Sequence, residues 1–217
     1  SDLADLNTPA TPLVMSGLAD VVTGSTPGLP GASLACPAYT SNPILDLRFE
    51  ELPGATSFAD ASLNATNATC TGNSCPAAGF SGAPNASASD YALQFDGVDD
   101  VISATTGILD SFTVAFWVKV PSGANPNGAL FSHGNYLSRG WGVYLNNGAP
   151  TLVFNGSPEV LASKRVDDGQ WHFVTATRDQ VSGDLAIYVD GALGASKAFG
   201  RENVNAGNLL TFGTAVD

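Results

Sequence analysis

Charged residues are scarce in this chain, and positively charged ones are scarcer still. Of 217 residues, 8 are Lys or Arg and 20 are Asp or Glu, which gives a formal net charge of −12 at pH 7. A nucleic-acid-binding surface needs Lys and Arg gathered along one face, because these residues neutralise the phosphates. The few cations here are scattered along the sequence. The composition therefore excludes nucleic acid as a partner.

Long apolar runs are also missing. No stretch approaches the roughly 18 consecutive apolar residues that a transmembrane helix requires, so no membrane insertion is expected. The first five residues, Ser-Asp-Leu-Ala-Asp, have neither the positive start nor the apolar centre of a secretory signal peptide. Few charges with abundant Gly, Ala, Ser, Thr and Asn are typical of a secreted β-protein. We therefore expect the mature chain of an extracellular or cell-surface protein.

Cysteine is rare, with 3 residues in the chain. Cys70 and Cys75 flank the turn-forming residues Thr-Gly-Asn-Ser, and this short loop favours a local disulfide. The alternatives are two buried thiols, or a zinc site completed by His133 and His172, which are distant in sequence. Cys36 is left over, which indicates an intermolecular disulfide or an unpaired thiol.

Four Asn-x-Ser/Thr triplets fit the acceptor pattern for N-glycosylation, a modification of secreted proteins. Such triplets also arise by chance in a chain this rich in Asn, Ser and Thr. The candidate acceptors are Asn64, Asn67, Asn85 and Asn155.

The chain divides into an arm and a folded part. Residues 1–42 contain scattered Pro among Ser, Thr, Gly and Ala without a sustained period, which predicts an extended arm or linker. Two apolar islands in it, residues 13–15 and 18–22, have the length of short strands. The folded part, residues 43–217, opens with alternating apolar and polar residues, and then residues 52–89 are loop-like.

Beyond residue 90 the pattern is β almost throughout. Short alternating or apolar segments are separated by Gly, Asn and Asp turns, and Asp190-Gly191 is a strong hairpin signal. Many short strands spaced by turns predict an all-β, antiparallel two-sheet sandwich. The expected strands are 44–50, 91–95, 100–102, 112–120, 129–132, 142–145, 151–154, 171–178 and 185–189. We expect a core that contains Phe95, Phe116, Trp117, Phe131, Trp171, Phe173 and Tyr188.

Several motifs in this region carry a resemblance to a known family. The segments 93–102, 112–119, 168–177 and 183–191 occur in the order and spacing of the laminin G-like jelly-roll domain, a member of the concanavalin A-like lectin/glucanase superfamily. The chain resembles that family from residue 43 to about 213. The resemblance implies a concanavalin A-like jelly roll. It does not choose among sugar binders, adhesion modules, enzymes and spacers, because this fold carries all of them.

Three tryptophans are candidates for either packing or ligand contact. Trp117 and Trp171 lie in alternating strands, which favours core packing, whereas sugar stacking would need exposed rings. Trp141 lies between glycines, close to Tyr136 and Arg139, and these three side chains form a candidate ligand platform. The alternative for Trp141 is packing, because members of the family usually carry an aromatic residue there.

Asp96, Asp99 and Asp100 form an acidic cluster in a turn. Adjacent carboxylates on a loop can bind calcium, which takes oxygen ligands, and several relatives of the resembled family hold calcium at the sandwich rim. The alternative is turn chemistry, in which the carboxylates cap backbone amides. A second, weaker candidate of the same kind is centred on Asp60.

Catalytic machinery is not evident, and no enzyme activity is expected. The glucanases of the superfamily need a Glu-x-Asp-x-x-Glu strand, which places two carboxylates on one face, and this sequence has none. His133 and His172 have no nucleophile beside them in the sequence.

Two functions remain. In the first, the chain is a structural or adhesion module that polymerises into filaments. In the resembled family a closing strand follows the segment 209–213, whereas this sequence stops at Asp217. Residues 13–22 of one subunit would then add to the open edge of a neighbour, and Cys36 could lock the two covalently; truncation or a rearranged closing strand is the alternative. In the second function, the chain is a glycan- or protein-binding lectin-like module of a larger secreted protein or hydrolase.

Overall fold

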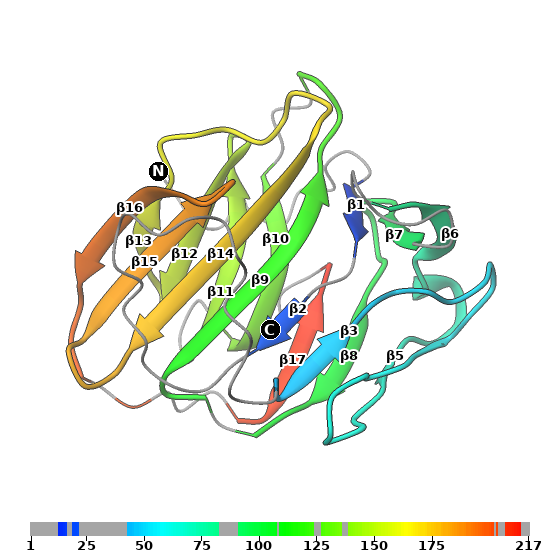
Figure 1. Cartoon of the computed structure of the whole chain (residues 1–217), viewed down its shortest axis with the longest axis horizontal. Coiled ribbons are helices and arrows are strands. Elements are labelled where there is room, and N and C mark those ends of the chain that lie inside the picture. The colour runs from blue at the N-terminus through cyan, green and yellow to red at the C-terminus, as the bar shows by residue number, and fades with distance from the viewer. Residues whose placement is uncertain are drawn as a thin grey trace.

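The computed structural model describes residues 13–16, 19–21, 43–82, 91–107, 109–123, 127–135, 139–201, 203 and 207–213. These residues form antiparallel strands and one short 3₁₀ helix, η2 (Gly72–Ser74). The strands build two large sheets, which stack as two layers in Figure 1. This is the jelly-roll sandwich that the sequence predicts. Among the described residues there is no helix long and apolar enough to cross a membrane.

The first sheet has seven strands. In spatial order they are β16 (Ala192–Ala198), β15 (Asp184–Val189), β14 (Trp171–Asp179), β9 (Phe112–Lys119), β1 (Leu13–Ser16), β7 (Tyr91–Phe95) and β6 (Ala77–Ser81).

The second sheet has eight strands, and a small third sheet has two. The eight are β13 (Ser157–Leu161), β12 (Ala149–Phe154), β11 (Arg139–Asn146), β10 (Gly128–Asn135), β17 (Leu209–Phe212), β8 (Ile102–Thr105), β5 (Ala68–Thr69) and β4 (Ser57–Phe58). The third sheet pairs β2 (Ala19–Val21) with β3 (Leu45–Leu47). In Figure 1, β9, β14 and β15 cross in front of β10, β11 and β12.

The core lies between the two large sheets. Strands β9 and β14 supply alternate residues to it, while β10, β11 and β12 are buried along most of their length. Phe95, Phe116 and Phe131 are buried as the sequence predicts. Burial of such side chains supplies most of the stabilisation of a sandwich, at roughly 1.5–3 kcal/mol for each large apolar side chain.

Four residues of the expected core lie elsewhere. Trp117, Trp171, Phe173 and Tyr188 are half-buried, on the side of the first sheet that faces away from the second. Successive side chains of a strand point to opposite faces, and in β9 and β14 both alternate sets include large apolar residues. A period of two therefore could not tell which set faces inward.

The loop-like segment 52–89 contains three short strands, β4, β5 and β6, which the sequence did not predict. Strands β13 and β16 were missed as well. The sequences of β6, AAGFS, and β16, ALGASKA, are rich in residues with low β propensity. Their extended conformation is set by pairing with β7 and β15, which local sequence does not reveal.

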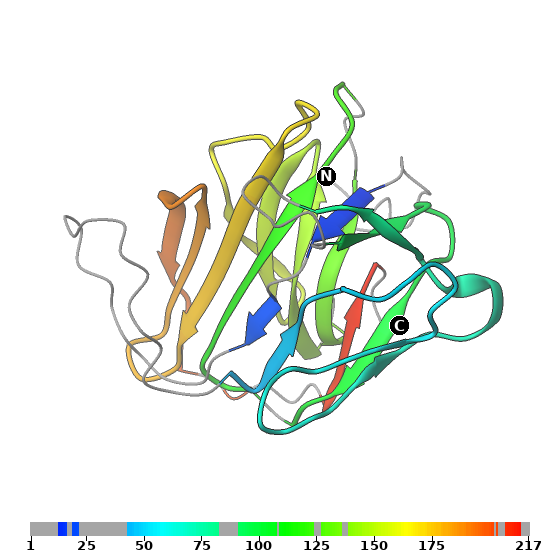
Figure 2. The same cartoon turned by 45° about the vertical axis from the view of Figure 1, so that its right-hand side comes forward.

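Both apolar islands of the N-terminal arm form strands. β1 lies between β7 and β9, with Met15 opposite both Leu93 and Val118. β2 pairs with β3, and Val21 lies opposite Leu45. Figure 2 shows β1 and β2 as the two dark blue strands beside the long green strand β9. The gap that the sequence assigned to a neighbour's arm is thus filled by the same chain.

Candidate functional site

Four large aromatic side chains share the outward side of the first sheet. We call this surface the outer aromatic face: Trp117 on β9, Trp171 and Phe173 on β14, and Tyr188 on β15. Phe173 lies opposite Trp117 in the strand register, and Trp171 lies opposite Lys119. The ring centres of Trp117 and Phe173 are 5.1 Å apart, with the planes tilted by 51°. Trp117 and Phe173 therefore form a ring pair across neighbouring strands, and Trp171 and Tyr188 lie on the same side of the sheet.

Strand β14 is mixed on both sides: Val174 and Ala176 are buried together with two polar residues, and two aromatic residues lie on the outward side. Its buried positions include His172 and Arg178. Arg178 donates a hydrogen bond to the carbonyl of Asp110, and its guanidinium lies 4.2 Å from the ring centre of Phe154. An alternating strand of a sandwich usually has apolar residues toward the core and polar residues toward water. Large apolar groups on an outward face are informative, because they mark contact surfaces.

A charged cluster surrounds His172, whose side chain points to the opposite side of β14 from Trp171. His172 Nδ1 lies 2.8 Å from Asp190 Oδ2, and His172 Nε2 lies 3.0 Å from Asp168 Oδ1. Lys164 Nζ donates to Asp190 Oδ2 at 2.5 Å, and the Phe173 amide donates to Asp190 Oδ1 at 2.9 Å. Two carboxylates thus hold the imidazole from both sides, and one of them also fixes the backbone of the aromatic strand.

Both carboxylates of this cluster stay ionised at neutral pH. Burial raises the pKa of Asp190, but hydrogen bonds from Lys164, His172 and the Phe173 amide outweigh this effect and leave the pKa below its ordinary value. The hydrogen bond from His172 likewise lowers the pKa of Asp168. The side chains of Lys164 and Asp168 are 51% and 56% exposed. Lys164 and Asp168 therefore keep exposed hydrogen-bonding groups around the His172 cluster.

The candidate platform of Tyr136, Arg139 and Trp141 is not an exposed aromatic site. Trp141 has no exposed surface and stacks on Phe112, with ring centres 3.4 Å apart and planes 8° from parallel. His133 also packs against it, at 5.5 Å between ring centres. Arg139 is exposed at the start of β11, whereas Tyr136 lies outside the described residues. Trp141 is thus a core residue, and sugar stacking on it is excluded.

His133 is fully buried beside Trp141. Its Nε2 lies 2.9 Å from the carbonyl oxygen of Gly107. Burial lowers the pKa of the imidazole, because the charged form would lose its hydration. The ring is therefore neutral and structural at physiological pH.

The acidic turn gathers three carboxylates. One oxygen from each of Asp96, Asp99 and Asp100 lies within 4.8 Å of the others. Asp96 Oδ1 accepts a hydrogen bond from the Val98 amide at 2.8 Å, and Asp100 Oδ2 accepts one from the Asp96 amide at 2.6 Å. Burial, and then the charges of Asp96 and Asp99, raise the pKa of Asp100. The donor type suits calcium, and the same oxygens also cap the turn.

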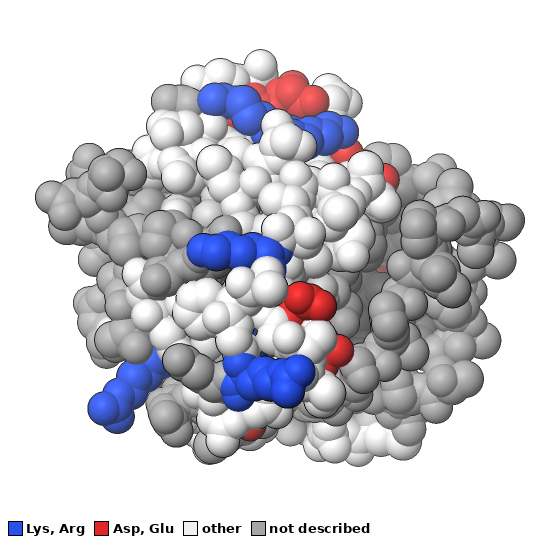
Figure 3. Space-filling model, turned by 90° about the vertical axis from the view of Figure 1, so that its left-hand side faces the viewer, with Lys and Arg blue, Asp and Glu red and all other residues white. Residues whose placement is uncertain are grey.

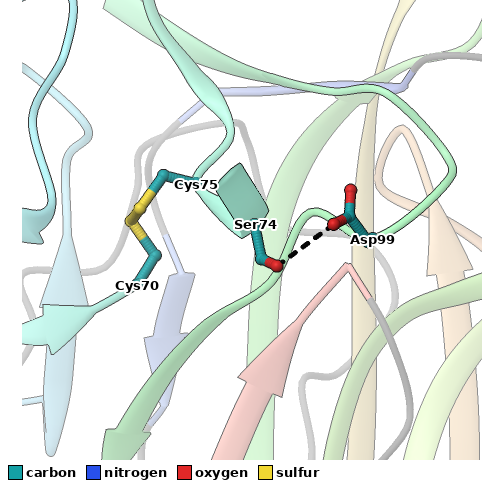
Figure 4. Close-up of a disulfide and its surroundings, with 4 residues drawn as sticks. All are labelled: Cys70, Ser74, Cys75 and Asp99. Carbon is teal, nitrogen blue, oxygen red and sulfur yellow. Dashed lines mark hydrogen bonds between the residues drawn. A yellow bond between two sulfur atoms is a disulfide. The ribbon is translucent and has the colours of Figure 1, made fainter. Parts of the chain in front are cut away.

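A disulfide joins Cys70 to Cys75, as the spacing predicts, and leaves neither sulfur as a zinc-binding thiolate. Figure 4 shows this loop next to the acidic turn. Ser74 Oγ donates a hydrogen bond to Asp99 Oδ2 at 3.2 Å, and the Val101 amide donates to the Ser74 carbonyl at 2.9 Å. The disulfide loop therefore packs against the acidic turn and fixes its position.

Asp60, the centre of the second candidate cation site, accepts hydrogen bonds that order its own loop. Its Oδ1 accepts hydrogen bonds from the amides of Asp46 and Ser62, both at 2.9 Å. Its Oδ2 accepts from Ser62 Oγ at 2.7 Å and from the Thr66 amide at 2.8 Å. Burial raises the pKa of Asp60, but these donors together lower it below the ordinary value. The contacts favour a structural role, in which the carboxylate organises the loop 60–67.

The candidate glycosylation sites differ in exposure. Asn64 and Asn67 are exposed, although Asn64 Nδ2 donates to the Ile44 carbonyl at 2.9 Å. Asn155 is half-buried, and its Oδ1 accepts from the Gly140 amide at 3.0 Å. Asn85 and Cys36 lie outside the described residues.

Charged side chains do not gather into one large patch on the face shown in Figure 3. There the Lys and Arg side chains are separated by uncharged surface, and several lie next to Asp or Glu. Among the described residues, Lys164 forms an ion pair with Asp190, and Arg165 forms one with Asp167. This arrangement agrees with the exclusion of a nucleic-acid-binding surface on this face.

Two stacked antiparallel sheets in this order define the concanavalin A-like class of jelly rolls. The family model described as the concanavalin A-like lectin/glucanases superfamily matches residues 96–217, more than half of the chain. The protein therefore belongs to this superfamily, in its laminin G-like branch. No curated protein matches the sequence.

Solved structures share the fold at low sequence identity. The binding domain of Paraclostridial Mosquitocidal Protein 1 is 15% identical, with 78% of this chain and 51% of that chain covered and a TM-score of 0.51. The binding domain of Botulinum Neurotoxin DC, in complex with SialylT, is 15% identical, with 82% and 49% covered and a TM-score of 0.50. A heptameric SAP-like pentraxin from Limulus polyphemus is 20% identical, with 52% and 56% covered and a TM-score of 0.42. The aligned part is about half of each of these chains.

Proposed function

We propose that this protein is a non-enzymatic, extracellular binding module, and that the outer aromatic face is its ligand-contact surface. The observation that carries the proposal is the set of aromatic side chains on the outward side of the first sheet, where Trp117 on β9 contacts Phe173 on β14 and Trp171 lies two residues from Phe173. Several half-buried aromatic rings on one outward side are typical of a contact surface, and this supports a ligand on that side of the sheet.

The ligand class that suits this face is a glycan. Sugar rings present apolar C–H surfaces, which stack on aromatic side chains, together with hydroxyl groups, which need hydrogen-bond partners. The outer aromatic face offers the rings, and Lys119, which lies opposite Trp171 on the same side of the sheet, offers a hydrogen-bond donor. The two solved neighbours named as binding domains support a binding role for this fold.

A catalytic role has less support. Both ring nitrogens of His172 face carboxylates, Asp168 and Asp190, so the imidazole is not placed to activate a Ser or Cys nucleophile. His133 is buried against Trp141. We therefore assign binding rather than turnover to this domain.

A glycan array followed by calorimetry tests the proposal. Wild-type protein should bind a subset of the array, and the double variant Trp171→Ala, Phe173→Ala should weaken that binding about tenfold or more, because each ring contact contributes on the order of 1 kcal/mol. Phe80→Ala is the matched control, since Phe80 is an exposed aromatic residue on another strand, β6. Equal losses in both variants, or no loss in the double variant, would refute the assignment.

Self-association through the N-terminal arm is a second candidate function, as expected of a structural or adhesion module. The position of β1 favours it, because residues 13–16 complete a sheet between two strands that are remote in sequence. Light scattering and negative-stain microscopy of the intact chain, over a range of concentrations, should reveal oligomers or filaments. A constant monomer mass at every concentration would exclude this candidate.

A further inference from the structure

Strand β1 fills a slot in the middle of the seven-stranded sheet. It pairs on one side with β7, where Leu13 lies opposite Phe95, and on the other with β9, where Val14 lies opposite Lys119. β7 and β9 do not pair with each other, since β1 stands between them in the sheet. Without β1 the slot would leave two facing edges of unpaired backbone groups, which is a template for an incoming strand.

The interior of the slot is apolar. Leu93 and Phe95 on β7, and Val118 on β9, are buried core residues that lie opposite or beside the β1 backbone. A strand is therefore needed in the slot for two reasons. It pairs with the backbone groups of β7 and β9, and it covers the core residues beneath it. Any copy of β1 that reaches the slot can meet both requirements.

The connection from the arm to the body is much longer than the fold requires. Val21, the last residue of β2, lies opposite Leu45, the first residue of β3. Directly paired residues of antiparallel strands have Cα atoms only about 5 Å apart, and a hairpin can close this distance with about two residues. Here residues 22–44 make the connection. Fully extended, a chain of that length reaches roughly 80 Å.

We propose that β1 exchanges between copies of this protein, so that β1 of one copy, together with β2, occupies the slot of a second copy. This inference rests on the proposed self-association and names its partner and contact site. The same strand contacts form within one chain and between two chains, so the balance depends on concentration. A connection of this length sets an effective concentration on the order of millimolar. Exchange should therefore rise as the protein approaches that range.

Mixing two cysteine variants tests the exchange directly. One variant carries Val14→Cys and the other Gln94→Cys, since Val14 lies opposite Gln94 and Gln94 is half-buried on the outward side. Both variants carry Cys36→Ser, and Cys70–Cys75 stays intact. The two chains are mixed under mild oxidation, from micromolar to about millimolar concentration. A mixed disulfide forms readily only when β1 of the first chain lies beside β7 of the second.

The control replaces Gln94→Cys with Thr177→Cys. Thr177 is also half-buried on the outward side, but it pairs with Thr113 at the opposite end of β9 from Lys119, which faces Val14. We expect the Val14–Gln94 heterodimer to exceed the control at least severalfold and to increase with concentration. Equal yields for the two pairs, at all concentrations, would overturn the exchange. If light scattering shows oligomers while the yields stay equal, self-association stands and this contact is wrong.

A hinge variant provides an independent measurement. Replacing residues 23–43 with Asn-Gly extends the β2–β3 ladder by one pair and closes it with a two-residue turn. In this variant only two residues join β2 to β3, so β1 and β2 cannot reach the slot of a neighbour while the β2–β3 pairing is kept. The variant should therefore remain monomeric where the full-length chain assembles. Oligomers of unchanged size would contradict the proposal. If circular dichroism shows that the variant is unfolded, the mixed-disulfide yields decide the question.

Discussion

At the scale of single residues, the two glycines beside Trp141 explain why its ring lies in the core. The sequence placed this ring in a turn because Gly140 and Gly142 flank it, yet both glycines lie within β11. A Cβ on Gly142 would lie 2.7 Å from the carbonyl oxygen of Phe131, and one on Gly140 would lie 2.3 Å from that of His133. The glycines therefore allow β11 to approach β10 closely. Close approach of two strands cannot be distinguished from a turn by sequence alone.

Asp60 gives the first prediction at this scale. Asp60→Asn should lower the free energy of unfolding by about 2 kcal/mol, because an amide NH₂ would replace one of two oxygens that accept charge-assisted hydrogen bonds. Urea unfolding at pH 7 measures the change. Asp184→Asn, at an exposed position, is the control and should have little effect.

The pH dependence of this effect follows from the lowered pKa of Asp60. A depressed pKa in the folded state contributes stability above the unfolded value of about 4, and this contribution is lost as pH falls through the folded pKa. The gap between wild type and Asp60→Asn should therefore narrow between about pH 5 and pH 2. A gap that stays constant over this range would show that the carboxylate charge is not responsible.

The acidic turn gives the second prediction. Asp100 is buried beside Asp96 and Asp99, and its raised pKa reflects both effects. A divalent cation would offset this repulsion, so we expect weak calcium binding and a rise in melting temperature at millimolar calcium. The double variant Asp99→Asn, Asp100→Asn should lose this rise. No calorimetric heat and no shift in the wild type would leave turn capping as the role of these carboxylates.

At the scale of elements, strand existence was more predictable than strand orientation. The long alternating segments that became β7, β9, β14 and β15 were found from sequence, because turns of Gly, Asn and Asp bound them. The residues of β14 that face the core were not predicted. His172 and Arg178 are polar, and their burial depends on partners from distant segments, such as Asp190 and Asp110. Partners of this kind are set by the tertiary fold.

The arm strands give the third prediction. The sequence predicted an extended arm outside the folded part, whereas in the structure β1 completes the first sheet and β2 pairs with β3. Deleting residues 1–21 should therefore destabilise the domain by several kcal/mol, because two sheet edges and part of the core lose their cover. Denaturant unfolding measures this change. A deletion that ends at residue 10 is the control, and equal stability of both deletions would contradict the role of β1.

At the scale of the whole molecule, the composition and the fold give different information about the surface. A net charge of −12 keeps the chain soluble and repels acidic polymers. The first sheet nevertheless presents aromatic rings outward, at Trp117, Trp171, Phe173 and Tyr188. Composition alone could not reveal this surface, because it averages over both sides of each strand. The superfamily membership fixes the architecture, while the ligand that we propose for this face depends on these particular side chains.

Hydroxyl-radical footprinting read by mass spectrometry tests the outer aromatic face most directly. In the free protein Trp171 should oxidise much faster than Trp141, which has no exposed surface. Saturation with the oligosaccharide that gives the strongest array signal should protect Trp117 and Trp171 severalfold and leave Phe80 unchanged. Oxidation of Trp141 as fast as that of Trp171, or no protection of either outer tryptophan by the bound sugar, would contradict the assignment of this face.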